Sequence, residues 1–246
     1  MAAEVPSVSA VNRAGNELRR IYAVPNPQTV MAPRAMDDSE IKKIFEAVDC
    51  LVAWRAAHAK PLGAATMGLR SRVATMGCEQ IEVSQRLKRI PTIVDKLRRE
   101  PKMMLGRMAD IGGCRAVLRD LEELQLVKAR YSGDKVTVRM KDYIEQPKPD
   151  GYRAVHVIVR YGGRLIEVQL RTKVQHEWAY TVESVTSRFG LDIKSGGGPP
   201  PVRDWFAAVS EAMAIEEHGQ PVGLDLLNRV DTLRVAAQPY LQGVRR

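Results

Sequence analysis

Polar side chains alternate with apolar ones along residues 164–171, and this row is the first candidate for chemistry in the sequence. If the stretch is a β-strand, Glu167, Gln169 and Arg171 share one face, because successive side chains on a strand point to opposite sides. That face then carries an acid, an amide and a base in a row. A strand that simply faces solvent would show the same pattern.

A second carboxylate, Asp110, lies in the sequence Asp-Ile-Gly-Gly-Cys-Arg at residues 110–115. An aspartate before paired glycines suits a tight backbone at the entrance to a strand, which is a common place for a Mg²⁺ ligand. Asp110 and Glu167 could hold one Mg²⁺ together with phosphate oxygens, since hard cations prefer oxygen ligands. Turn glycines beside a solvated aspartate are the alternative interpretation.

Basic residues concentrate at positions 86–107, where eight lysines and arginines accompany only two acids. The whole chain has a net charge of +9, so this short segment holds +6 of it. A solvated helix face seldom needs so much charge of one sign. A triphosphate does, because lysine supplies a point charge and arginine a two-pronged hydrogen-bond donor. We therefore expect nucleotide phosphates to bind here.

The segment 141–156 is rich in proline and polar residues and leads into a predicted strand. Tyr152 and His156 are four residues apart, so on a strand they would face the same side. There the ring could stack on a nucleic base and the imidazole could meet a phosphate. Packing alone would also explain a tyrosine at the start of a strand.

The elements that must position these residues alternate between helix and strand. The residue patterns predict strands at 81–83, 114–118, 135–140, 152–161 and 164–171. Gly162 and Gly163 join the last two strands as a hairpin. Apolar periodicity predicts helices at 11–21, 37–58, 61–73, 91–99, 120–130, 173–189, 203–217 and 224–237. The fold class is therefore α/β or α+β, with a central sheet of about five strands flanked by helices at both ends of the chain.

The 246 residues divide into three predicted parts. Residues 1–36 form a helix and a proline-containing linker, residues 37–190 the domain that carries the chemistry, and residues 191–246 a Gly/Pro turn and helices that pack on that domain. No stretch approaches the roughly 20 apolar residues that span a bilayer, and the N-terminus does not resemble a secretory signal. We expect a cytoplasmic protein with an anionic partner.

Five segments, in this order and spacing, resemble the synthetase domain of the RelA/SpoT family, the ATP-dependent pyrophosphotransferases. The segments are residues 84–96, 110–115, 141–156, 167–172 and 175–179. The resemblance implies a nucleotidyltransferase-like fold with a mixed five-stranded sheet. It also implies transfer of the β,γ-pyrophosphate of ATP to the 3′-hydroxyl of an acceptor, with release of AMP.

On the donor side, the resemblance implies that Arg86 and Arg115 sandwich the adenine of ATP. Lys88 and Lys96 would hold its phosphates. Phosphoryl-type transfer depends mainly on positioning and on cationic stabilisation of spreading negative charge, which fits the basic segment.

The resemblance further implies that Asp110 and Glu167 bind Mg²⁺, with Glu167 also helping to deprotonate the attacking hydroxyl. Tyr152 would stack on the acceptor's base. The acceptor side would also be lined by Lys148, His156, Gln169 and His176.

Three features set this chain apart from other members of the family. Thr92 stands where the family often has serine, a mild departure that keeps the hydroxyl. None of the four histidines is followed by aspartate, so we predict no hydrolase domain of the kind that long bifunctional members carry. The length also leaves no room for their large regulatory C-terminal half, and a stand-alone small synthetase is expected.

The acceptor is the open question. Residues 54–62 and several motifs resemble the toxic small alarmone synthetases, so the first hypothesis is a toxin that acts on the 3′-terminal adenosine of tRNA and needs a separately encoded antitoxin. Basic residues outside 86–107 would suit a polyanionic acceptor, although a solvated surface explains them equally. The alternative is a (p)ppGpp synthetase that uses GDP or GTP. A remote third hypothesis is an inactive nucleotide- or RNA-binding module.

Overall fold

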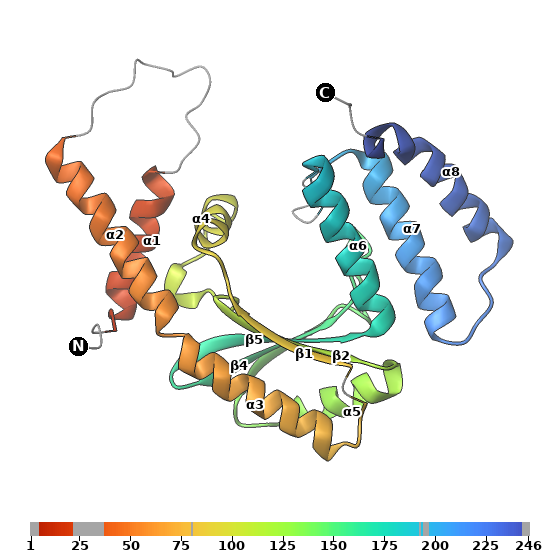
Figure 1. Cartoon of the computed structure of the whole chain (residues 1–246), viewed down its shortest axis with the longest axis horizontal. Coiled ribbons are helices and arrows are strands. Elements are labelled where there is room, and N and C mark those ends of the chain that lie inside the picture. Colours follow the sequence, from red (N-terminus) through yellow and green to blue (C-terminus); the bar gives the residue numbers. More distant parts are fainter. Residues whose placement is uncertain (1–4, 22–36, 80, 192, 194–196, 243–246) are drawn as a thin grey trace. The chain divides into compact units, whose positions relative to one another are not determined.

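The predicted sheet of five strands is present in the computed structural model, which describes residues 5–21, 37–79, 81–191, 193 and 197–242. The strands are β1 (Glu82–Leu87), β2 (Gly112–Leu118), β3 (Thr137–Asp142), β4 (Val155–Tyr161) and β5 (Arg164–Thr172). Their order in the sheet is β1-β2-β5-β4-β3, so β5 lies between β2 and β4 (Figure 1). The predicted α+β class with a mixed sheet is confirmed.

The connection between β4 and β5 is the two-residue turn that the sequence predicts. Gly162 has a φ of 51° and Gly163 a φ of 74°. Glycine adopts this left-handed conformation without steric cost, and two such residues in succession match the twist of a hairpin.

The helices are close to their predicted positions. Their bounds are α1 (Val8–Ile21), α2 (Asp38–Ala56), α3 (Ala59–Thr75), α4 (Ile90–Arg99), α5 (Leu121–Tyr131), α6 (Lys173–Phe189), α7 (Pro200–Glu217) and α8 (Leu224–Leu241), with a short 3₁₀ turn η2 at Leu105–Arg107. None of these helices is long and apolar enough to cross a membrane. The predicted linker at 22–36 and part of the predicted Gly/Pro turn lie outside the described residues.

Packing divides the chain into two compact units. The first unit contains residues 1–68, 85–114 and 158–167, and the second contains residues 69–84, 115–157 and 168–246. β1, β2, β4 and β5 each contribute residues to both units. Because each unit draws on more than one of the three parts expected from the sequence, that three-part division stays a prediction.

The first unit has a core in which α1 and α2 lie side by side (Figure 1). Leu18 of α1 and Leu51 of α2 are fully buried in it, with Ile93 of α4. Arg19 of α1 extends beyond this core and donates from Nε to the carbonyl of Leu97 at 2.9 Å. The N-terminal helices therefore support the basic segment.

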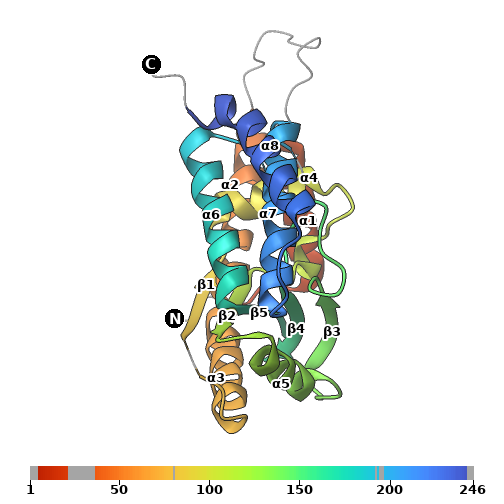
Figure 2. The same ribbon diagram turned by 90° about the vertical axis from the view of Figure 1, so that its right-hand side faces the viewer.

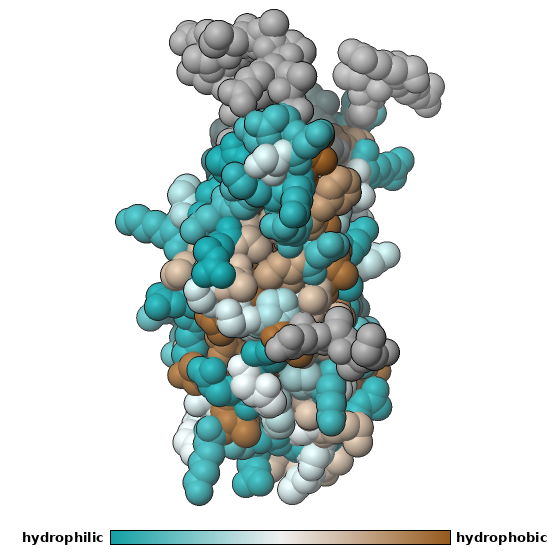
Figure 3. Space-filling model, turned by 90° about the vertical axis from the view of Figure 1, so that its left-hand side faces the viewer, coloured by the Kyte–Doolittle hydropathy of each residue, from teal (hydrophilic) through white to brown (hydrophobic). Residues whose placement is uncertain are grey.

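Several apolar side chains of α2 face solvent instead of the core. Ile41, Phe45 and Val52 are exposed, and on the face seen in Figure 3 hydrophobic side chains lie scattered among hydrophilic ones. These three residues are four and seven positions apart and therefore share one face of α2, but nothing in the structure shows what covers that face.

In the second unit, α6, α7 and α8 lie side by side around a separate core (Figure 2). Trp178 of α6 and Phe206 of α7 meet edge to face, with ring centroids 6.2 Å apart. The Trp178 indole also donates to the Phe206 carbonyl at 3.0 Å, which satisfies its buried N–H.

α7 holds the loop that precedes β4. Gly151 has a φ of 88°, and a Cβ there would come within 2.9 Å of the Cα of Ala207, so the loop lies directly on the α7 backbone. Ser210 donates to the Gly151 carbonyl at 2.5 Å. Arg153 donates to Ser210 at 3.2 Å and forms an ion pair with Glu217 at 2.6 Å. Both neighbours of Tyr152 are therefore held by one helix.

The same carboxylate also holds the end of β5. Glu217 accepts a hydrogen bond from the Thr172 hydroxyl, and Thr172 is the N-cap of α6, paired with Gln175 in a capping box. The Arg153–Glu217 pair is almost fully buried, with side chains 3% and 4% exposed. Removing one partner of such a pair leaves an uncompensated buried charge.

We expect Glu217→Gln to lower the free energy of unfolding by about 3 kcal/mol, because Arg153 would then be buried without a counter-charge. Urea unfolding measures this change. Glu211→Gln is the matched control, since it removes an exposed α7 carboxylate that pairs with Arg229. It should cost less than about 1 kcal/mol. Equal effects of the two substitutions would contradict the role of the buried pair.

Candidate active site

Two lysines and one aspartate converge in the first unit. The ammonium groups of Lys88 and Lys96 lie 2.8 and 3.0 Å from the same oxygen, Oδ2 of Asp110. All three side chains are only about one-fifth exposed. The structure therefore brings together three of the predicted site residues, and we call them the lysine–aspartate cluster.

Backbone hydrogen bonds position the cluster. Lys88 directly follows β1, and its N–H donates to the carbonyl of Ile111, the residue after Asp110, at 2.8 Å. Arg55 of α2 donates from Nε to the Lys88 carbonyl at 2.7 Å. Lys96 comes from α4. Segments far apart in the sequence thus present two cations to one acid.

The pKa of Asp110 is set by two opposing effects. Burial alone would raise the pKa of this carboxyl, but the charges of Lys96 and Lys88, with their hydrogen bonds, outweigh it and hold the pKa below its usual value. Its second oxygen, Oδ1, is buried and has no hydrogen-bond partner. An ionised carboxylate with one oxygen uncommitted suits a hard cation such as Mg²⁺.

Glu167 lies in the first unit on β5. Ile166, the residue before Glu167 on β5, lies close to Gly112, the first residue of β2. A Cβ at Gly112 would meet Cδ1 of Ile166 at 2.8 Å. Gly112 thus lies close to a side chain of the neighbouring strand, inside β2, whereas the sequence predicts a tight backbone before the strand. Among the described residues no group of three acids, histidines or cysteines could hold a metal ion. A shared cation would need oxygens from a bound phosphate as well.

The two arginines expected around adenine lie in different units. Arg86 is an exposed residue of β1, which runs through Leu87, whereas the sequence predicted that this strand ends at Val83. Arg115 donates from Nη2 to Glu82 at 3.0 Å and to Ser84 at 3.2 Å. Their role as a pair around one base stays a prediction.

Three rings gather in the second unit, from Tyr143, Tyr152 and His156, and we call them the aromatic cluster. The hydroxyl of Tyr152 lies 2.6 Å from Nε2 of His156. The Lys148 ammonium lies 4.8 Å from the ring centroids of both tyrosines. The expected proximity of Tyr152 and His156 is confirmed, although β4 begins only at Val155, so Tyr152 precedes the strand instead of starting it.

The end of β5 and the first turn of α6 lie around this cluster. Arg171 donates from Nη2 to the Tyr152 hydroxyl and to Oε1 of Gln169, both at 3.0 Å. His176 lies 4.0 Å from Glu82. Burial lowers the pKa of His176, and the nearby charges of Arg115 and Arg171 lower it further. The residues predicted for the acceptor side are thus near one another within the second unit.

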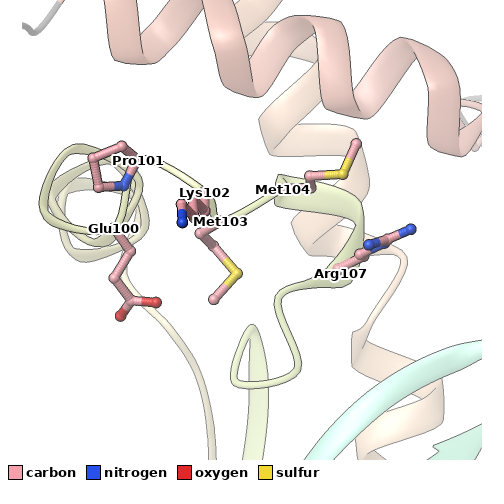
Figure 4. A pocket seen from close by; sticks show the side chains of 6 residues that line it. All are labelled: Glu100, Pro101, Lys102, Met103, Met104 and Arg107. Carbon is pink, nitrogen blue, oxygen red and sulfur yellow. The ribbon is translucent and has the colours of Figure 1, made fainter.

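A separate pocket of about 440 Å³ lies along residues 100–107 of the basic segment (Figure 4). Met103 and Met104 contribute its apolar lining, and Lys102 and Arg107 its cations. None of the predicted site residues lines this pocket. Four of the eight cations of the segment therefore lie in the lysine–aspartate cluster or line this pocket.

Arg171, Arg55 and Glu217 belong to these networks but were not among the predicted site residues. Arg171 had a detectable signal, since it shares a strand face with Gln169. Arg55 and Glu217 had none, because they act from helices through contacts 33 and 64 residues away in the sequence.

Comparison with known proteins matches residues 85–187 to the family described as "Region found in RelA / SpoT proteins". The GTP pyrophosphokinase YjbM of Bacillus subtilis is 31% identical over 142 residues, which cover 53% of this chain and 65% of that protein. The chain thus spans slightly less than two thirds of this relative's length.

Solved structures support the same fold. The small alarmone synthetase 1 from Bacillus subtilis matches with a TM-score of 0.59 and 24% identity, over 78% of this chain and 99% of that one. The structure of the same synthetase bound to its product pppGpp matches with a TM-score of 0.57 and 23% identity, over 68% of this chain and 93% of that one.

We expect the lysine–aspartate cluster to make the free energy of unfolding depend on pH in the acidic range. Since the folded-state pKa of Asp110 is lowered, its contribution is present above the unfolded pKa of about 4 and is lost as the pH falls through the folded value. The difference in unfolding free energy between the wild type and Asp110→Asn should therefore be larger at neutral pH and shrink in acid. Asp95→Asn, at an exposed i,i+4 pair with Arg99, is the control and should cost less than about 1 kcal/mol. A pH-independent difference for Asp110→Asn would contradict this role.

Proposed function

We propose that the protein is an ATP-dependent pyrophosphokinase that makes (p)ppGpp, and the match of residues 85–187 to the region found in RelA/SpoT proteins supports this proposal. It would transfer the β,γ-pyrophosphate of ATP to the ribose 3′-hydroxyl of GDP or GTP and release AMP. The observation that carries the proposal is the lysine–aspartate cluster, in which two cations and a carboxylate with a free oxygen are held together.

On the donor side, Lys88 and Lys96 are the proposed ligands of the ATP phosphates. Their ammonium groups, held in place by Asp110, would stabilise the negative charge that spreads over the transferred group. Arg86 and Arg115 are the proposed contacts of the adenine. Because Asp110 positions Lys88 and Lys96 before substrate binds, these two side chains need little reorganisation during the reaction.

Asp110 and Glu167 are the proposed Mg²⁺ ligands, and the buried, partnerless Oδ1 of Asp110 fits this role. When bound, Mg²⁺ would neutralise phosphate charge and help orient the pyrophosphate. Glu167 would also accept the proton of the attacking 3′-hydroxyl at its carboxylate.

On the acceptor side, Tyr152 is the proposed stacking platform for the base. Its hydroxyl is held by His156 and Arg171, so the ring has a defined orientation. Lys148, His156, Gln169 and His176 are the proposed polar contacts of the acceptor. α7 would contribute indirectly, since it holds both neighbours of Tyr152.

The choice of guanine nucleotide rests on the relatives. They are named a GTP pyrophosphokinase and a small alarmone synthetase bound to pppGpp, which supports the second acceptor hypothesis over the first. Neither the tRNA acceptor nor an antitoxin partner gains support from the relatives described above. The tRNA 3′ end remains an outcome that the following assay can detect.

The deciding experiment incubates the protein with ATP labelled at the γ-phosphate, Mg²⁺ and one of GDP, GTP or deacylated tRNA. We expect label on the guanine nucleotides, together with AMP, because pyrophosphate transfer carries the γ-phosphate to the acceptor. Label on tRNA alone would contradict alarmone synthesis and support the hypothesis of a toxin that modifies tRNA. Label on no acceptor, with the protein folded, would favour a binding module.

We expect Glu167→Gln to reduce pyrophosphate transfer by about 10²- to 10⁴-fold, since it removes the proposed proton acceptor and a charged metal ligand. Steady-state rates and circular dichroism together measure activity and folding. Glu177→Gln, at an exposed acid of α6, is the matched control and should leave the rate unchanged. A fully active Glu167→Gln protein would refute the assignment of this carboxylate.

A further inference from the structure

Arg171 is a buried cation that the predicted site did not include. It is the penultimate residue of β5 and only 6% exposed. Its Nη2 donates to two neutral oxygens, the Tyr152 hydroxyl and Oε1 of Gln169. Its Nε is buried and has no hydrogen-bond partner.

The charge of Arg171 is not balanced by an acid. In the part of the chain that the structure describes, no ion pair joins Arg171 to a carboxylate, and its guanidinium contacts only neutral groups. Arg153 shows the contrast, because this equally buried arginine pairs with Glu217 at 2.6 Å. Burying a charge without a counter-charge is unfavourable, so Arg171 lowers the free energy of unfolding unless another group offsets its charge.

The surroundings of Arg171 are also positive. The Lys148 ammonium lies 4.8 Å and the Arg171 guanidinium 5.2 Å from the centroid of the Tyr152 ring. The positive charges of Arg115 and Arg171 both lower the pKa of His176. Two acids, Glu82 and Glu183, also act on His176, and Glu82 is engaged by Arg115 at 3.0 Å. Three cations, Lys148, Arg115 and Arg171, therefore lie near two acids beside the proposed acceptor platform.

We infer that Arg171 binds an anionic group of the acceptor, namely the phosphates of a guanosine diphosphate or triphosphate. The inference rests on the proposed function and extends it by a residue that selects the phosphorylated form of the acceptor. A guanidinium with donors left over suits a phosphate, which accepts charge-assisted hydrogen bonds at two oxygens. The bound anion would then supply the counter-charge that the chain lacks.

A purely structural arginine would behave differently when removed. If Arg171 only supported Tyr152, its loss would lower the melting temperature and affect all acceptors alike. If it is an unbalanced charge kept for a ligand, its loss relieves a buried charge. Stability should then be unchanged or higher while binding of phosphorylated acceptors weakens.

The test compares Arg171→Met with the wild type by calorimetric titration of guanosine, GMP and GDP, with a non-hydrolysable ATP analogue present to occupy the donor site. In the wild type, affinity should rise with the number of phosphates. In Arg171→Met the Kd for GDP should increase about 10- to 100-fold more than the Kd for guanosine, the range expected for a charge-assisted hydrogen bond, while the guanosine value reports any loss of support for Tyr152. Arg160→Met, at an exposed arginine of β4, is the control and should bind GDP as the wild type does.

The melting temperature of each protein is the second measurement. An unchanged or raised value for Arg171→Met, together with the lost preference for GDP, supports the inference. A lowered melting temperature with an unchanged ratio of GDP to GMP affinity, or a variant that does not fold, overturns it. Arg171→Lys keeps the charge and should retain part of the GDP preference, and failure to do so also counts against the inference.

Binding is measured without turnover, so the two proposals can fail separately. If the protein makes no alarmone but Arg171→Met loses the preference for phosphorylated guanosine, the anion subsite stands and the proposed reaction falls. If alarmone forms and the preference is unaffected, the reaction stands and the role of Arg171 falls.

Discussion

The attraction between one carboxylate and two ammonium groups organises the first unit. Asp110 lies before β2, Lys88 after β1 and Lys96 on α4, so the cluster joins three segments through charge. Like charges this close would repel one another without the acid between them. Arg55 reinforces the arrangement from α2 by holding the Lys88 carbonyl. The N-terminal helices thus form part of the support of the proposed donor site.

The second unit shows how differently two buried arginines can be treated. Arg153 has its counter-charge in Glu217, and their pair locks the Tyr152 loop and the start of α6 onto α7. Arg171 has neutral partners instead. One arginine therefore stabilises the fold, whereas the other presents positive charge beside the aromatic cluster. This contrast separates scaffold from binding surface inside a single unit.

Much of the fold was predictable because its signals are local. The hairpin at Gly162 and Gly163 needs only a turn pair between two strands, and helix periodicity is visible within a few turns. Errors occurred where local signals compete. β1 extends to Leu87 because its later residues pair in the sheet despite their charge. Tyr152 lies before β4 because Gly151 and Arg153 are held by α7, which no local pattern indicates.

The sequence by itself determined the elements, the match of residues 85–187 to the region found in RelA/SpoT proteins, and the set of charged residues available for phosphate chemistry, since these depend on neighbours along the chain. Only the tertiary structure decided which charges are balanced. Arg153 meets its acid 64 positions away, and Lys88 shares Asp110 with Lys96 across 22 and 14 positions. Charge pairing depends on distance in space and on burial, and folding alone sets both. For this reason a buried arginine without an acid, Arg171, could be distinguished from its paired counterpart only in the folded chain.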